Sequence, residues 1–224
     1  MPLILGTAIL VLALWLAYGL WRASVGRSQH RARYFAKTTP LFDRVVTRTE
    51  PTGFARMTGH LGRDAFDLQA LPDSLTFRKL PSLWVMLTLP QPLPVAATLD
   101  IMVRPTGQEC FSHYPSLPQS LPCPAFLPGG TGIRSDDAAG VAPLDLVSRH
   151  AAIFADPRVK ELVISAKGLR IVIQGDQADR SRYLLFRDAE LGLAPLPAAR
   201  AEPLIKTLLA LKADILAQAK DHSR

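Results

Sequence analysis

Residues 82–89 read Ser-Leu-Trp-Val-Met-Leu-Thr-Leu, and this run decides the fold class. Alternate residues of a strand point to opposite faces, and here both sets are mostly apolar, so we expect a central strand covered on two sides. The segments 42–47, 53–61 and 65–71 alternate partly and are separated by Pro and Gly, which predicts further strands. Residues 98–104 alternate more regularly. The first half of the domain is therefore predicted to be a sheet.

The second half of the chain mixes helices and strands. A helix over 144–154 follows Pro143, which suits a first helical turn. Strands are predicted at 133–137, 162–165, 169–173 and 182–187, the last three as an antiparallel meander. Residues 203–220 predict an amphipathic helix with one apolar stripe, formed by Leu204, Leu208, Leu211 and Ile215. We expect an α+β fold, with a mostly antiparallel sheet and packed helices that include the C-terminal one.

The beginning of the chain carries no charged side chain as far as Trp21. Residues 3–20 form an apolar run of 18 residues, which as a helix spans roughly 27 Å, close to the hydrocarbon thickness of a bilayer. Trp15, Tyr18 and Trp21 gather towards its end, as in an aromatic belt. We expect residues 1–21 to be a single transmembrane anchor. A cleaved signal peptide is the alternative, although no Lys or Arg precedes the run.

Residues 22–40 form a basic juxtamembrane segment that precedes a soluble domain at 41–224. Residues 1–37 contain no acid, and their basic side chains are Arg22, Arg27, Arg31, Arg33 and Lys37. The positive-inside rule then places the domain on the cytoplasmic side of the inner (plasma) membrane, with a short translocated N-terminus. The segment is either a solvated stop-transfer flank or a lipid-binding element, since each basic residue near an anionic surface contributes roughly 1 kcal/mol.

The position of the charge argues against a nucleic-acid partner. The chain has a formal net charge of +7, but the residues after Lys37 hold 21 basic and 19 acidic side chains, a net of +2. A nearly neutral domain lacks the basic patch that nucleic acid requires. The expected partners are the lipid bilayer and another membrane or membrane-associated protein.

Residues 105–132 are rich in Pro and Gly and form either a long surface loop or a linker between two subdomains. This stretch contains Cys110, His113 and Cys123, spaced C-x2-H-x9-C, as weak candidates for metal ligands. A structural zinc site takes four ligands, usually as two close pairs, so no metal site is assigned. A Cys110–Cys123 disulfide and two free thiols are the other interpretations.

Other motifs give no catalytic set and imply no cofactor. Asp136-Asp137 is interpreted as an acidic turn, with a cation bound by both carboxylates in a loop as the alternative. A catalytic dyad is disfavoured, because adjacent residues of an extended chain point to opposite faces. The glycines of 129–132 lack the Lys-Ser/Thr of a phosphate-binding loop, and His60 is the histidine most worth testing for catalysis.

The leading functional hypothesis is an interaction or assembly module. Proline-rich runs at 89–94 and 114–128 suit partner binding in a polyproline II conformation. The alternatives are a membrane-proximal enzyme, such as a hydrolase, and a metal- or redox-sensing domain.

Residues 133–173, roughly 40 residues, have a strand–helix–hairpin pattern that resembles a pattern in other proteins. The strand at 133–137, the helix at 144–154 and the hairpin at 162–173 with Lys167-Gly168 at its turn resemble a pattern in uncharacterised bacterial membrane-anchored proteins. The resemblance implies a bacterial origin and a membrane-tethered α+β domain. It implies no activity and no site residues.

Overall fold

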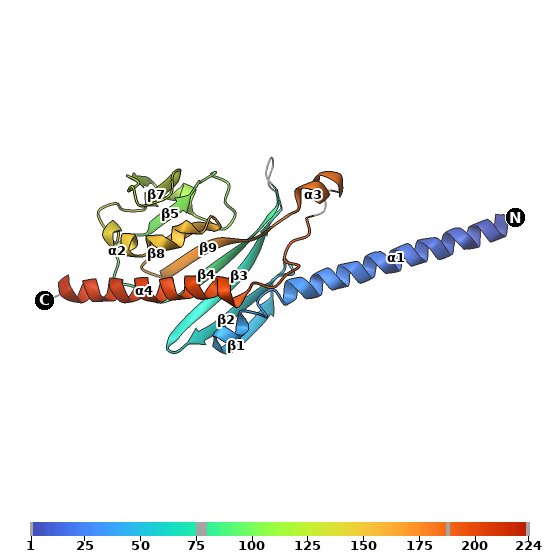
Figure 1. Ribbon diagram of the computed structural model, residues 1–224, viewed down its shortest axis with the longest axis horizontal. Helices are drawn as coiled ribbons and strands as arrows, with labels where there is room; N and C mark the ends of the chain where they lie inside the picture. The colour runs from blue at the N-terminus through green and yellow to red at the C-terminus, as the bar shows by residue number, and fades with distance from the viewer. Residues whose placement is uncertain (1, 75–79, 187–188, 223–224) are drawn as a thin grey trace.

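The structure, a computed structural model, describes residues 2–74, 80–186 and 189–222, with the backbone alone for residues 2–5, 7–9, 186 and 222. A long helix, α1 (Pro2–Ala32), projects from a domain in which the described strands form one nine-stranded sheet (Figure 1). The expected α+β class with a large antiparallel sheet is confirmed.

Every neighbouring pair of strands in this sheet is antiparallel. The strands are β1 (Asp43–Thr49), β2 (Ala55–Leu61), β3 (Asp64–Asp73), β4 (Ser82–Leu89), β5 (Leu99–Val103), β6 (Gln119–Leu121), β7 (Thr131–Ser135), β8 (Val159–Ser165) and β9 (Gly168–Gln177). Their spatial order is β1-β2-β3-β4-β9-β8-β5-β7-β6, so β4 is an interior strand, as its two apolar faces predict. β5 and β7, on either side of the proline-rich stretch, pair directly with each other.

The sheet has two different faces, which β4 illustrates. Leu83, Val85 and Leu87 point to one face, the helix face, where they belong to the main hydrophobic core. Helix α4 (Ala198–His222) covers this face, with its buried stripe of Leu204, Leu208, Leu211 and Ile215 (Figure 1). The short helix α2 (Leu144–Arg149) packs beside α4. Trp84 and Met86 point to the opposite face, the loop face.

The base of α1 is fixed to the domain. Tyr34 and Phe35, just after the helix, are buried in the main core. The Thr38 hydroxyl donates to the Leu196 carbonyl (2.9 Å), and the Leu196 N–H donates to the Tyr34 carbonyl (2.8 Å). Within the helical residues whose side chains are described, no stretch is both long and apolar enough to cross a membrane.

The strand expected at 182–187 is wrong, because residues Arg180–Phe186 form a helix, α3. β9 ends at Gln177, and the Asp179 side chain then accepts from the Arg182 N–H (2.8 Å). An aspartate in this position caps the first turn of a helix, which explains why the chain coils instead of continuing the sheet. The expected three-strand meander is therefore only the β8–β9 hairpin.

Candidate functional site

The loop face is covered by the segment of residues 104–118, which we call the covering segment. Its Phe111 and Tyr114 are buried against Met102 of β5 and Val172 of β9. The rings of Trp84 and Phe111 lie 4.9 Å apart, a separation that suits tilted aromatic packing. Part of the predicted proline-rich loop therefore acts as a lid over the sheet, and the predicted split into two subdomains stays a prediction.

Charged contacts anchor the covering segment. Glu109 accepts from the Thr106 N–H (2.7 Å) and hydroxyl (2.8 Å), and lies 3.1 Å from the Lys160 ammonium of β8. Lys160 also donates to the Val103 and Arg104 carbonyls. Although burial opposes ionisation, these hydrogen bonds and the charge of Lys160 hold the pKa of Glu109 below its usual range. The segment is thus fixed at its first turn.

Two carboxyl groups lie beneath this segment on neighbouring strands. Asp100 of β5 is paired with Val163 of β8, and Glu161 stands two residues away on β8, on the same face. Asp100 is 2% exposed and Glu161 is fully buried. The Arg170 guanidinium of β9 lies 3.3 Å from Glu161 and forms its ion pair. A single cation, Arg170, therefore lies close to two buried carboxyl groups and is ion-paired with one of them.

This shortage of positive charge decides where a proton is held. Burial, and then the charge of Glu161, raise the pKa of Asp100 to about 8. Burial also raises the pKa of Glu161, but the Arg170 guanidinium and the Ser112 hydroxyl oppose this shift. Because Arg170 bonds Glu161 directly, we assign the carboxylate to Glu161 and the neutral carboxylic acid to Asp100 at neutral pH. Asp100 Oδ1 and Glu161 Oε1 are buried and have no hydrogen-bond partner among the described residues.

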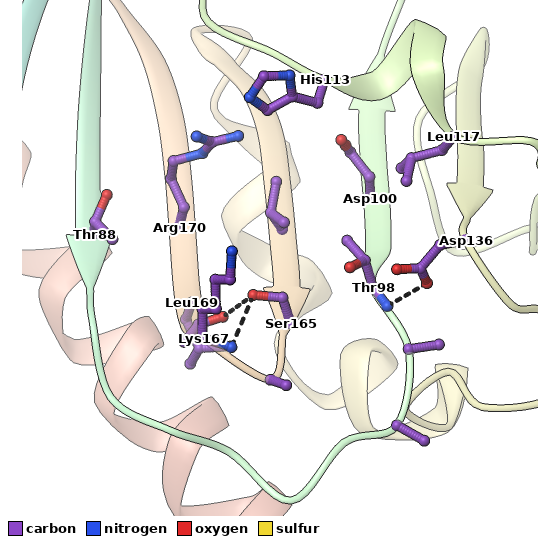
Figure 2. Close-up of a pocket in the computed structure, with 15 residues that line it drawn as sticks. Thr88, Thr98, Asp100, His113, Leu117, Asp136, Ser165, Lys167, Leu169 and Arg170 are labelled. Atoms are coloured by element: carbon purple, nitrogen blue, oxygen red, sulfur yellow. Dashed lines mark hydrogen bonds between the residues drawn. The ribbon is translucent and has the colours of Figure 1, made fainter.

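A cavity of about 540 Å³ opens beside this pair. Figure 2 shows Arg170, His113 and Asp100 around one end of it, with Lys167 rising from the β8–β9 turn. The lining also has an apolar part, formed by Ala96, Ala97, Leu117, Val163, Ala166 and Leu169, and three hydroxyl side chains, Thr88, Thr98 and Ser165. The cavity thus combines four charged or titratable groups able to donate hydrogen bonds, Asp100, His113, Lys167 and Arg170, with an apolar wall that suits the carbon skeleton of a ligand.

Asp136 also lines the cavity, but its charge is already engaged. Its Oδ1 accepts from the Thr98 N–H (2.7 Å; Figure 2) and from the Asp137 N–H (3.0 Å). Burial raises the pKa of Asp136, but the hydrogen bonds from Thr98 and Asp137 together lower it below its usual range. Asp136 therefore holds the start of β5 beside the end of β7.

Gly168 makes the β8–β9 turn possible. It has a φ of +134°, and a Cβ at this position would collide with the Leu89 carbonyl oxygen and the Gln91 nitrogen. Only glycine fits such a conformation and such a close backbone approach. The turn is thereby held against the end of β4, and this contact fixes Lys167 at the rim of the cavity.

The weak metal candidates do not come together around an ion. Cys110 and Cys123 are both free and exposed, and the described residues contain no group of three His, Cys, Asp or Glu side chains arranged for a metal. Burial of the thiol, with the charge of Asp73, raises the pKa of Cys110 to about 11, although the residue as a whole is exposed. Of the three, His113 lines the cavity.

The remaining expected residues lie elsewhere. Arg22, Arg27, Arg31, Arg33 and Lys37 belong to α1 and the turn after it, and Arg31 stacks over the Phe54 ring at 5.3 Å. His60 lies in β2 and does not line the cavity. Sequence reasoning missed Asp100, Glu161 and Arg170. For Asp100 and Arg170 the available sign was a charged residue with an apolar neighbour on each side within a predicted strand, whereas Glu161 follows Lys160 and has no such sign.

Comparison with models of protein families, with curated proteins and with solved structures finds no match for this chain. The geometry of the cavity is therefore the basis for a functional assignment. The resemblance to uncharacterised bacterial membrane-anchored proteins stays a prediction.

Proposed function

We propose that this protein is a single-pass membrane-tethered binding module whose loop-face cavity takes a small organic anion, with a carboxylate or phosphate group. The tether is supported by the uncharged run of 18 residues at 3–20 and by the basic flank that follows it. The large apolar side chains from Leu10 to Trp21 are more than half exposed, as lipid-facing residues would be. The same flank supports a cytoplasmic domain at the inner membrane.

The balance of donors and acceptors in the cavity supports an anionic ligand. Glu161 is paired with Arg170, and Asp136 accepts two backbone N–H groups, so both carboxylates are engaged. Lys167 makes no ion pair among the described residues, and neutral Asp100 supplies an O–H donor. A carboxyl group held neutral in this way donates a hydrogen bond instead of repelling an anion. These two donors on the cavity wall, the Lys167 ammonium and the Asp100 O–H, are the observation that carries the proposal.

The test is thermal melting of the full-length protein in mild detergent with sodium phosphate, acetate or succinate, each matched by chloride at equal ionic strength. A bound anion at roughly 100 times its Kd adds about 2.7 kcal/mol, or several degrees in Tm. Lys167→Ala should remove most of this shift. Lys206→Ala, an exposed lysine of α4, is the matched control and should keep it. If none of the anions raises Tm, or if Lys167→Ala melts like the wild type with anion, the proposal fails.

The pH dependence gives a second readout. Stabilisation by the anion should weaken as pH rises through about 8, because Asp100 then loses its O–H donor and becomes an anion. Asp100→Asn should bind at pH 7 and keep the anion-induced shift above that pH.

A hydrolase is the second candidate, because a neutral acid and an imidazole, Asp100 and His113, line one cavity. General acid catalysis requires such a neutral group beside the reacting atoms. Asp100→Asn separates the two functions, since it would keep anion binding and abolish turnover. The expectation of a membrane-protein partner stays a prediction.

A further inference from the structure

Helix α3 carries an exposed apolar patch that the functions above leave unused. We define the α3 patch as Arg180, Leu184 and Leu185. The two leucines are 56% and 76% exposed, respectively, and Arg180 is exposed. Two adjacent leucines this exposed on one short helix differ from single scattered apolar residues, which need no explanation.

The opposite side of α3 holds the helix to the domain. Tyr183 packs against the main core, and the Arg182 guanidinium donates to Glu190 at 2.6 Å. The Asp179 cap fixes the first turn. The helix is therefore attached through one side, and its leucines point outward.

The connection after α3 ties the α3 patch to the base of α1. The Gly192 N–H donates to Asp176 (2.8 Å), and Leu196 exchanges hydrogen bonds with Tyr34 and Thr38 just beyond the end of α1. Figure 1 shows α3 standing off the body on the side from which α1 extends, whereas α4 ends on the opposite side. The α3 patch and α1 thus leave the same end of the domain.

We propose that the α3 patch rests in the headgroup region of the membrane that α1 crosses, against an anionic lipid surface. This inference rests on the proposed tether. Apolar side chains next to arginine are the composition by which short amphipathic elements bind at a lipid interface. The basic residues that follow the apolar part of α1 face the same surface and select negative lipid by charge complementarity. The domain would then touch the bilayer at two points and hold a fixed orientation above it.

The test uses spin labels on the full-length protein in vesicles of phosphatidylcholine and phosphatidylglycerol in equal amounts. In a Cys110→Ser, Cys123→Ser background, single labels are introduced by Leu185→Cys, Val46→Cys and Trp15→Cys. Val46 is the matched control, since it is apolar and 66% exposed but lies on the edge strand β1 and not on α3. Label 185 should be severalfold more accessible to oxygen than to a water-soluble nickel complex, and label 46 the reverse. Arg180→Glu, or vesicles of phosphatidylcholine alone, should reduce this contrast.

The Trp15→Cys label separates the two proposals. If label 15 is protected from nickel while label 185 is as open to nickel as label 46, the tether stands and the lipid contact is overturned. If label 185 is shielded from both reagents, a protein surface such as a second copy covers the α3 patch, which also overturns the lipid contact. If label 15 is itself open to nickel, the tether and the inference built on it both fail.

Discussion

Asp100 and Glu161 show how one arginine divides two buried carboxyl groups into different chemical states. Arg170 bonds Glu161 and leaves Asp100 without a cation of its own. A buried carboxylate without a cation is costly, so a proton on Asp100 is the lower-energy state even though the Ser112 hydroxyl bonds to it. The ability of Asp100 to donate a hydrogen bond therefore depends on Glu161 and Arg170 as well. Any substitution of Arg170 would change the pKa of both acids.

The raised pKa of Asp100 predicts how stability depends on pH. Folding moves this pKa from 3.8 to about 8, so between these values the folded state binds more protons than the unfolded chain, and the free energy of unfolding falls as pH rises. Asp100→Asn removes this slope and should be more stable than wild type above pH 8 by roughly 2 kcal/mol or more, or about 4–8 °C in Tm. Melting curves of full-length protein across pH measure this difference.

Asp145→Asn is the control for that experiment, because Asp145 is exposed on α2 and should leave the pH profile unchanged. If the difference in the free energy of unfolding between wild type and Asp100→Asn does not change between pH 5 and pH 8, the raised Asp100 pKa is contradicted.

At the scale of elements, alternation and length predicted the strands well and the site poorly. The strands predicted at 82–89 and 98–104 are confirmed, because the order of apolar and polar side chains along a strand shows which of its faces are buried. Residues 182–187 were misread because a short apolar run fits a helix or a strand equally well, and the Asp179 cap decided the outcome. Asp100 reads as a solvent-facing strand residue, since only tertiary structure places the covering segment over it. Glu161 and Arg170 reach it through strand pairing that no local pattern encodes.

The packing of α4 predicts a clear contrast between two leucines. Leu211 is fully buried against the helix face, and Leu211→Ala should cost about 3 kcal/mol, from lost burial and the cavity left behind. Leu185→Ala on α3 removes the same atoms from an exposed site and should cost less than about 0.5 kcal/mol. Thermal melting of both variants in detergent measures the difference. Equal losses would mean that the Leu185 side chain is packed against the domain or that the Leu211 side chain is not.

At the scale of the whole molecule, the two faces of the sheet differ in what they pack against. The helix face holds the core that α4 completes, and the loop face holds the cavity under the covering segment. α1 and α3 leave one end of the domain, and α4 ends at the other (Figure 1). With α1 in a membrane, the C-terminus would therefore be directed away from the bilayer, and the exposed cysteines would report on the compartment that contains the domain.

This geometry makes the predicted orientation measurable with the native thiols. Cys110 and Cys123 are free and exposed, so a membrane-impermeant maleimide should label them only after lysis of cells that produce the full chain, if the domain is cytoplasmic. The raised pKa of Cys110 slows its reaction, because the thiolate is the reactive form, so Cys123 is the thiol to follow. Pro2→Cys in a Cys110→Ser, Cys123→Ser background should show the opposite pattern, with labelling in intact cells. Labelling of Cys123 in intact cells would reverse the assigned orientation and place both cysteines where disulfides form.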